Sequence, residues 1–250
     1  HAAMQCPEED VAPFRKKFPQ FEDKIGKYGH GTKVRNPVAA FAGMMTRMDR
    51  GGGQVLDLLD ELKIADNTLV LFSSDNGPHH EGGHQPGFFN SNGPLKGHKR
   101  DLYEGGIRVP LIAYWPGRVK AGSVNDHICA HWDLMPTFCE LAKTSTPAHT
   151  DGISYVPALT GGKQKKHDYL YWEFHSYGNA QAIRMGDWKA IRLKVKNNPN
   201  APIQLYNLKQ DIGETKNIAA AHPNVVKRIA PLFKEAHAPS ERFPLFAKKR

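Results

Sequence analysis

Cysteine is scarce in this chain of 250 residues and occurs at only three positions, Cys6, Cys129 and Cys139. None of the three belongs to a Cys-x-x-Cys pair, so the sequence offers no thiolate cluster of the kind that holds zinc. The odd number also excludes a complete set of disulfides within these residues. We expect Cys129 and Cys139 to pack as small apolar side chains.

Long apolar runs are also missing, and no stretch approaches the roughly 20 apolar residues that a membrane-spanning helix requires. A dinucleotide-binding Gly-x-Gly-x-x-Gly pattern is not present either, because the three glycines at 51–53 have a different spacing. The chain begins at His1, without a signal-like segment, and we expect it to be part of a longer protein. The missing signal therefore says nothing about the compartment.

Acidic residues are outnumbered, with 25 Asp and Glu against 34 Lys and Arg, which gives a formal net charge of +9. The basic residues cluster mainly at 163–166 and 248–250, and neither cluster is interleaved with aromatic residues. This distribution does not favour nucleic-acid binding, for which one basic face is typical. It does suit an anionic small substrate, which a positive protein attracts over long range.

The most informative stretch runs from residue 68 to residue 110. Its apolar residues 69–72 are long enough for one buried strand and lead into the polar sequence Ser-Ser-Asp-Asn-Gly. Ligands gather where the buried strands of α/β proteins end. Adjacent carboxylate and amide oxygens are typical ligands of calcium or magnesium, so Asp75 and Asn76 are candidate metal ligands. A plain turn is the alternative interpretation of these two residues.

A second motif follows at residues 97–110, which read Gly-His-Lys-Arg-Asp-Leu-Tyr-Glu-Gly-Gly-Ile-Arg-Val-Pro. This segment resembles the one that identifies the formylglycine-dependent sulfatases, in which a Ser-Asp-Asn-Gly strand end precedes it. Both motifs occur here in that order and with a typical separation, and the resemblance extends over nearly the whole chain. It implies hydrolysis of sulfate monoesters and an alkaline-phosphatase-like fold.

The resemblance assigns roles to residues of both motifs. Asp75 and Asn76 match two metal ligands of the family, which implies Ca2+ or Mg2+ as a cofactor. Lys99 matches a catalytic lysine that binds the sulfate group, and His98 beside it is a further substrate-binding candidate. Lys96 competes with Lys99 on charge alone, and the spacing to the Glu-Gly-Gly sequence favours Lys99.

His1 matches the family's proton donor to the leaving alcohol, although a surface histidine at a chain end is the alternative interpretation. The family's nucleophile is a formylglycine made from the Cys or Ser of a Cys/Ser-x-Pro/Ala-x-Arg motif, which this sequence lacks. Cys6 has neither the spacing nor the Arg. We expect the motif and the remaining metal ligands upstream of His1, so the 250 residues alone are predicted to bind metal weakly and to have no turnover.

The resemblance also implies partners and a location. The substrate of the full-length protein would be a sulfated small molecule or a sulfated glycan. The protein would need a formylglycine-generating or anaerobic sulfatase-maturing enzyme and would be periplasmic or secreted. A phosphatase or phosphodiesterase of the same superfold and a noncatalytic relative with a degenerate site remain alternatives.

Sequence patterns predict an α/β fold in two parts. Pro37 opens a long helix with apolar residues every three to four positions, and the strand at 69–72 follows it. We expect residues 1–150 to be the C-terminal part of a catalytic α/β domain with a mostly parallel sheet and flanking helices. Short strand patterns and a last amphipathic helix predict that residues 151–250 form a small domain with an antiparallel sheet and a packed terminal helix.

Two regions outside the main motifs are candidates for substrate contacts. Glu173 and His175 lie at the end of one short strand pattern, a place where polar residues are common in any case. The loop at 77–97 is long and rich in Gly, His and Asn, and we expect it to line the substrate site. Its three histidines could ligate zinc, but no helix pattern aligns them, so a zinc site is disfavoured.

Overall fold

The structure, a computed structural model, describes residues 4–247. The chain divides into two compact units that interleave in sequence. Unit 1 comprises residues up to 69 together with residues 78–93, and unit 2 comprises residues 70–77 together with residues from 94 onward. The domain boundary that the sequence places at residue 150 stays a prediction.

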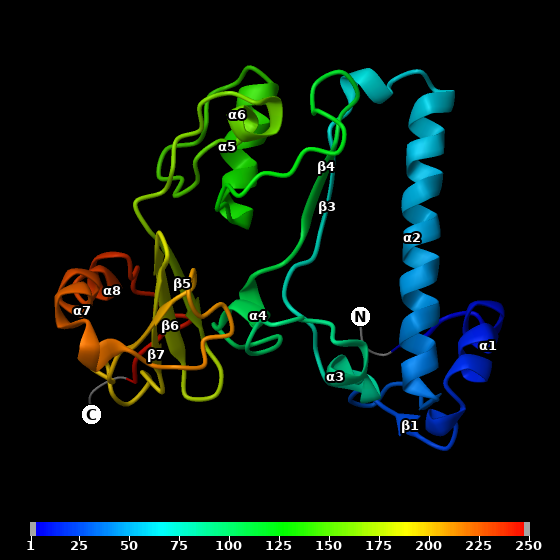
Figure 1. The fold of residues 1–250 in the computed structure, drawn as a ribbon, viewed down its shortest axis with the longest axis horizontal. Coiled ribbons are helices and arrows are strands. Elements are labelled where there is room, and N and C mark those ends of the chain that lie inside the picture. The colour runs from blue at the N-terminus through cyan, green and yellow to red at the C-terminus, as the bar shows by residue number, and fades with distance from the viewer. Residues whose placement is uncertain (1–3, 248–250) are drawn as a thin grey trace. The chain divides into compact units, whose positions relative to one another are not determined.

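Unit 1 is built on two helices that pack side by side (Figure 1). Its elements are α1 (Glu8–Lys17), β1 (Ile25–Gly26), β2 (Val34–Arg35), α2 (Pro37–Glu61) and α3 (Pro86–Phe89). Met4, Val11, Ala39 and Ala40 form the buried core between α1 and the first part of α2. Asp10 on α1 is buried and forms ion pairs with Arg47 and Arg50 on α2, which ties the two helices together.

Helix α2 is the long helix that the sequence predicts. Asn36 caps its first turn by accepting a hydrogen bond from the Ala39 backbone N–H at 3.0 Å, and Pro37 occupies the first helical position. The three glycines at 51–53 lie inside the helix and do not interrupt it. The apolar stripe beyond this point remains exposed, with Val55 at 52% and Leu62 at 55% exposure.

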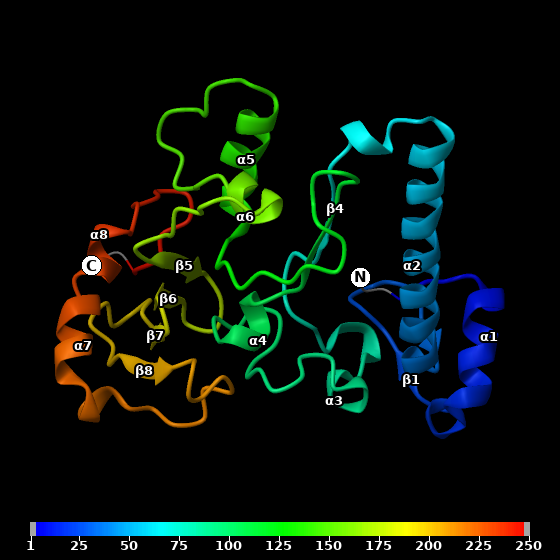
Figure 2. The same cartoon turned by 45° about the horizontal axis from the view of Figure 1, so that its top comes forward.

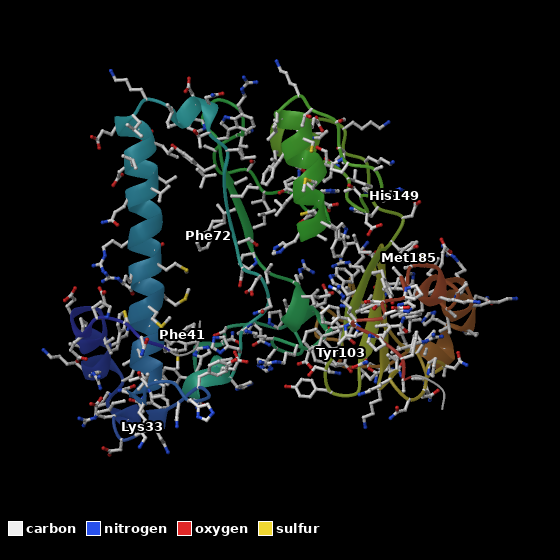
Figure 3. All side chains as sticks on the ribbon, turned by 180° about the vertical axis from the view of Figure 1, so that it is seen from behind. Lys33, Phe41, Phe72, Tyr103, His149 and Met185 are labelled. Atoms are coloured by element: carbon white, nitrogen blue, oxygen red, sulfur yellow. The ribbon has the colours of Figure 1, made fainter. Side chains whose placement is uncertain are left out.

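Unit 2 begins with a pair of strands, β3 (Val70–Ser73) and β4 (Leu111–Tyr114). They are antiparallel, with Val70 opposite Tyr114 and Ser73 opposite Leu111. The expectation of a mostly parallel sheet is therefore wrong for the strands of this chain. The physical reason is that the connection leaves β3 and enters β4 at the same edge, whereas a parallel pair needs a crossover to the opposite edge. Both strands carry exposed apolar side chains, including Phe72 at 44% exposure (Figure 3).

The larger sheet of unit 2 is antiparallel, as predicted, with strands in the order β5-β6-β7-β8. The strands are β5 (Leu170–Phe174), β6 (Ala180–Met185), β7 (Trp188–Leu193) and β8 (Gln204–Asn207). Gly186, with a φ of 59°, forms the tight turn between β6 and β7. Helices α7 (Pro223–Ile229) and α8 (Leu232–Glu235) lie at one side of this sheet (Figures 1 and 2).

Both faces of the β5–β8 sheet are covered. On one face Ile183, Ala190 and Leu205 pack with Ile229 and Phe233 of the terminal helices. The packed terminal helix expected from the sequence is therefore confirmed, as two short helices. The other face packs against residues 102–107, a segment that contains helix α4 (Glu104–Ile107). Figures 1 and 2 show α4 between this sheet and the β3–β4 pair.

Asp133 lies directly before helix α5 (Leu134–Leu141), and helix α6 (Val156–Thr160) follows further along the chain. The Asp133 carboxylate is buried and accepts hydrogen bonds from the backbone N–H groups of Ala130 and Ile153, both at 2.8 Å. The His167 ring nitrogen lies 2.9 Å from the same carboxylate. Within residues 4–247, no helix has both the length and the apolar character needed to cross a membrane.

Candidate functional site

The end of strand β3 is held against helix α4 by backbone contacts. Asp75 is exposed, Asn76 is half-buried and Gly77 is buried. The Gly77 N–H donates a hydrogen bond to the Gly106 carbonyl at 2.9 Å. A Cβ atom at residue 77 would lie 1.8 Å from the Gly105 carbonyl oxygen, so only glycine allows this approach.

The same two glycines of α4 carry the segment that contains Lys99. The Gly105 N–H donates to the Lys96 carbonyl at 2.7 Å. Cβ atoms at residues 105 and 106 would lie 2.3 Å from the Gly97 oxygen and 2.1 Å from the Asp101 oxygen. The Glu-Gly-Gly sequence therefore allows two segments, residues 75–77 and 96–101, to pack against one pair of residues.

Residues 97–101 form a tight turn with Lys99 near its tip. The His98 N–H donates to Asp101 Oδ2 at 2.9 Å, and the Asp101 N–H donates to the His98 carbonyl at the same distance. Gly97 has a φ of 88° and Arg100 a φ of 81°, a conformation that is unusual for a residue with a side chain. Such strain persists only where the surroundings fix the backbone, and it is common at functional sites.

Aromatic side chains attach the base of this turn to the β5–β8 sheet. The Tyr103 hydroxyl donates to Gln204 Oε1 at 2.6 Å, and Figure 3 shows Tyr103 beside α4. The Lys96 ammonium lies 4.2 Å from the centroid of the Tyr103 ring and donates to the Glu214 carbonyl at 3.1 Å. Lys96, the alternative anion-binding residue in the sequence, is therefore engaged in contacts at the base of the turn.

A buried group of charges lies beneath the turn. Glu104 is 1% exposed, and its carboxylate accepts from Lys189 Nζ at 2.7 Å and from Arg184 Nη1 at 3.0 Å. Burial by itself raises the pKa of Glu104, but Lys189, Arg184 and Arg108 outweigh burial and hold that pKa below its ordinary value. Glu104 is therefore an ionised residue with a structural role. In the sequence, Glu104 serves only to locate Lys99, and nothing there predicts that its side chain is buried.

Glu214 completes this group of charges from the loop after β8. Its Oε2 accepts from the Glu104 backbone N–H at 2.7 Å, and its Oε1 lies 3.8 Å from Lys189 Nζ. Burial raises the pKa of Glu214 to about 7, because Lys189 and the backbone N–H of Glu104 offset the lost solvation only in part. Nothing in the periodicity of the sequence indicates that this glutamate is buried.

The two substrate-binding candidates on strand β5 differ in their surroundings. The Glu173 carboxylate accepts a hydrogen bond from the Tyr171 hydroxyl and pairs with His237 near the chain's end. Gln181 donates to the same Tyr171 hydroxyl at 2.7 Å, so Glu173 is part of an internal network. His175 follows the strand and is exposed. A role in substrate binding stays a prediction for both residues.

Among the described histidines of unit 1, His84 lies in a cluster of aromatic side chains. His84 is buried, stacks on the Phe41 ring at 3.7 Å between centroids, and has no hydrogen-bond partner at either ring nitrogen. Burial lowers its pKa to about 4. Within residues 4–247, no group of three His, Cys, Asp or Glu side chains is placed to hold a metal ion. His1, the proposed proton donor, lies outside the described residues.

A divalent cation fits the residues at the β3 end only in part. Asp75 and Asn76 supply carboxylate and amide oxygens, the donor types that Ca2+ and Mg2+ prefer. The side-chain amide nitrogen of Asn76 donates to the Gly77 backbone carbonyl at 2.9 Å. The Ser74 hydroxyl donates to the Asn76 backbone carbonyl at 2.8 Å. These bonds stabilise the turn that presents both side chains. Ca2+ takes six to eight oxygen ligands, so the pair provides a fraction of a complete shell.

Comparison with known proteins places these motifs in a family. A model of the sulfatase family matches residues 1–144, and a model described as N-sulphoglucosamine sulphohydrolase, C-terminal, matches residues 97–237. The chain is 37% identical over 164 residues to the steryl-sulfatase of Homo sapiens. This alignment covers 64% of this chain and 27% of the steryl-sulfatase. The chain is 29% identical over 242 residues to an N-acetylgalactosamine-6-O-sulfatase of Bacteroides thetaiotaomicron, which covers 90% of this chain and 45% of the relative.

Solved structures agree with this assignment. Ps i-CgsB in complex with k-i-k-neocarrahexaose superposes with a TM-score of 0.76 at 31% identity, over 94% of this chain and 47% of that one. The fold is therefore the alkaline-phosphatase-like α/β fold expected from the sequence. The chain spans less than half the length of these relatives. Because the sulfatase family model matches more than half of the chain, this protein belongs to the sulfatase family.

Proposed function

We propose that the protein of which these residues are part hydrolyses sulfate monoesters, and that the turn at 97–101 binds the sulfate group. The contact at Gly105 and Gly106 carries the proposal. Both the strand end at 75–77 and the turn that contains Lys99 pack against these two glycines. In the proposal, the metal ligands, through the cation they hold, and the Lys99 ammonium group therefore bind the same anion. Membership of the sulfatase family supports the same reaction.

The chemistry requires positive charge around the ester. A sulfate monoester carries negative charge on its oxygens, and cleavage places more of it on the leaving oxygen. In the proposal Lys99 binds the sulfate and the bridging oxygen, with His98 beside it. Lys96 contacts Glu214 and Tyr103 at the base of the turn, and the spacing to the Glu-Gly-Gly sequence favours Lys99 for this role.

Asp75 and Asn76 are the residues that would hold a divalent cation, and we propose Ca2+, with Mg2+ as the alternative. Bound there, the cation would neutralise and orient the sulfate oxygens. The formylglycine nucleophile and the maturing enzyme that makes it belong to the same proposal, as do proton donation by His1 and a periplasmic or secreted location. The sequence of the complete protein tests these points through its Cys/Ser-x-Pro/Ala-x-Arg motif and any export signal.

As the substrate class we propose a sulfated glycan, with a sulfated small molecule as the alternative. Of the relatives that align over 90% or more of this chain, one is named for an N-acetylgalactosamine sulfate ester and another was solved with a neocarrahexaose. The steryl-sulfatases of Homo sapiens and Rattus norvegicus align over 64% and 82% of this chain, so a steroid sulfate is the alternative substrate class. The positive charge of the chain suits a polyanionic glycan through electrostatic steering.

Substitution of Lys99 tests the proposal. In the full-length protein we expect Lys99→Met to lower kcat/KM for a sulfate ester by about 100-fold or more, because one preorganised charge on the anion is lost. The matched control is Lys120→Met, which removes an exposed lysine from the same unit. Sulfate release from an aryl sulfate and from sulfated galactosamine is measured by ion chromatography.

The same assay separates the alternatives. Release of phosphate rather than sulfate from matched esters by the wild type would replace the proposal with a phosphatase of this superfold. No release of either by a protein that has the nucleophile motif and a bound divalent cation would indicate a noncatalytic relative. A Lys99→Met variant with full sulfatase activity would leave the reaction in place and remove Lys99 from it.

A further inference from the structure

The buried charges beneath the Lys99 turn come from four separate segments of unit 2. Glu104 begins α4, Arg184 and Lys189 lie on β6 and β7, and Glu214 lies in the loop after β8. Lys189 and Glu214 are both 0% exposed, although the strands around them are apolar. Lys189 bridges the two carboxylates, at 2.7 Å from Glu104 Oε1 and 3.8 Å from Glu214 Oε1.

A group of this kind is stable only as a whole. Taking charges out of water is costly, and the cost is offset only if each charge keeps its partners and hydrogen bonds. Removing Lys189 would leave a buried Glu104 carboxylate with Arg184 and the more distant Arg108, whose nearest nitrogen is 3.7 Å away. The Glu104 carboxylate would then have to move toward water or take up a proton.

The group holds the Lys99 turn on both sides. Upstream of the turn, the Lys96 ammonium donates to the Glu214 carbonyl at 3.1 Å. Downstream, the Glu104 backbone N–H donates to Glu214 Oε2 at 2.7 Å, and Leu102 packs into the sheet with Ile191 and Tyr206. A shift of Glu104 would therefore move α4, whose next two residues support the turn and the β3 end.

We propose that Lys189 and Arg184 are positioning residues for the sulfate-binding turn, so that the C-terminal sheet determines where Lys99 lies. Neither residue touches the substrate in this proposal. Both bind the Glu104 carboxylate and so fix the start of α4. Gly105 and Gly106, the next two residues of α4, are thereby held in place. The inference rests on the proposed function for its catalytic consequence, but its structural part stands on the contacts alone.

The first test is Lys189→Met in the full-length protein. We expect faster amide hydrogen exchange in peptides that cover residues 96–106, and a fall of at least tenfold in kcat/KM for the sulfate ester. Most of the fall should be in kcat, because a misplaced ammonium matters most where negative charge develops. A variant with wild-type exchange in these peptides and with kcat/KM within twofold of wild type overturns the proposal.

Arg192→Met is the matched control. Arg192 lies three residues further along the same strand, so it projects from the opposite face of the sheet. Its guanidinium stacks over Phe233 of α8 at 4.6 Å. We expect this variant to have a lower Tm with unchanged exchange in peptides 96–106 and unchanged kcat. If Arg192→Met and Lys189→Met have the same effects on exchange and on kcat, a general loss of stability explains both and the proposal fails.

Two further variants keep the test decisive. Arg184→Gln removes one bond to Glu104 at the partly exposed edge of the group and should give a smaller change of the same kind if Lys189→Met does not fold. The double variant Glu104→Gln/Lys189→Met leaves no uncompensated charge on Glu104 and should recover part of the lost kcat and exchange protection. No change in Arg184→Gln, or no recovery in the double variant, contradicts the proposal.

Failure of the proposed function would be visible separately. If the wild type releases no sulfate from any ester, the reaction is wrong, yet the exchange measurements still decide whether the C-terminal sheet positions residues 96–106. If sulfate is released and Lys189→Met changes neither exchange nor kcat, the reaction is right and the positioning role is wrong.

Discussion

Three glycines, Gly77, Gly105 and Gly106, determine which residues can meet at the candidate site. Each is buried, and a Cβ atom on any of them would lie within 2.3 Å of a backbone oxygen. Backbone atoms cannot move aside as a flexible side chain can, so these positions exclude every other residue type. The charged side chains of the site depend on this close approach of three backbone segments.

A single methyl group tests this dependence. We expect Gly77→Ala to lower the free energy of unfolding by at least about 2 kcal/mol, because the added carbon overpacks against the Gly105 carbonyl. The control is Gly52→Ala in α2, where the new Cβ meets nothing within 4 Å. There the same substitution should stabilise by about 0.5–1 kcal/mol through helix propensity. Denaturant unfolding measures the change in the free energy of unfolding for both variants. A change of the same sign in both would contradict the close contact between residue 77 and the Gly105 carbonyl.

At the scale of elements, α4 is a helix of four residues that connects larger parts of unit 2. It receives the β3 end through Gly106 and the Lys99 turn through Gly105, and Glu104 fixes it to β6 and β7. So short a helix has little stability of its own, because helix nucleation is unfavourable. Its position is therefore set by the charges and apolar residues around it.

The pH dependence of stability reports on these charges. The pKa of Glu214 is about 7 in the folded chain, against an ordinary value of 4.5 when unfolded. A raised folded-state pKa means that the folded state binds the proton more tightly, so this contribution is present below pH 4.5 and is lost as the pH rises through 7. The charged and titratable groups that face Glu214 are Glu104, Lys189, Lys96, Arg184 and Tyr206.

Glu214→Gln removes the titrating group while keeping an oxygen that can accept from the Glu104 N–H. We expect the wild type to lose about 2–3 kcal/mol of stability relative to this variant between pH 5 and about pH 8. Urea unfolding of both proteins across this range measures the difference. A constant difference at all pH values would show that Glu214 titrates normally.

At the scale of the whole molecule, several large apolar side chains are exposed on secondary-structure elements that usually bury them. On β3 and β4, Phe72, Leu111 and Ile112 have exposures of 44%, 40% and 59%, and the second half of α2 is similar. Large exposed apolar patches mark surfaces that bind other protein segments. The chain also spans less than half the length of the steryl-sulfatase, the N-acetylgalactosamine-6-O-sulfatase and Ps i-CgsB.

Residues 1–250 produced alone are therefore expected to lack sulfatase turnover and to bind Ca2+ weakly, since Asp75 and Asn76 supply only part of a coordination shell. They should also bind a hydrophobic dye through the exposed strands. Sulfate release, calcium calorimetry and dye fluorescence are the three measurements, with the full-length protein as the control. Full-rate hydrolysis of an aryl sulfate by the isolated 250 residues would show that they contain a complete site.

The sequence by itself determined the family, the long helix after Asn36, the antiparallel C-terminal sheet and the residues proposed to bind metal and sulfate. These features are encoded locally, in motifs, caps and periodicities that need no knowledge of distant residues. The direction of β4 relative to β3 was not encoded in this way, because an apolar strand pattern is the same in both directions. Only the tertiary structure decided it.

The tertiary structure alone also revealed the buried charges of Glu104, Lys189, Arg184 and Glu214. Their bonds join residues up to 110 positions apart, and each residue taken alone resembles an ordinary surface charge. Whether such a residue is buried depends on which partner the fold brings to it, since a charge leaves water only when distant charges and hydrogen bonds replace the lost solvation.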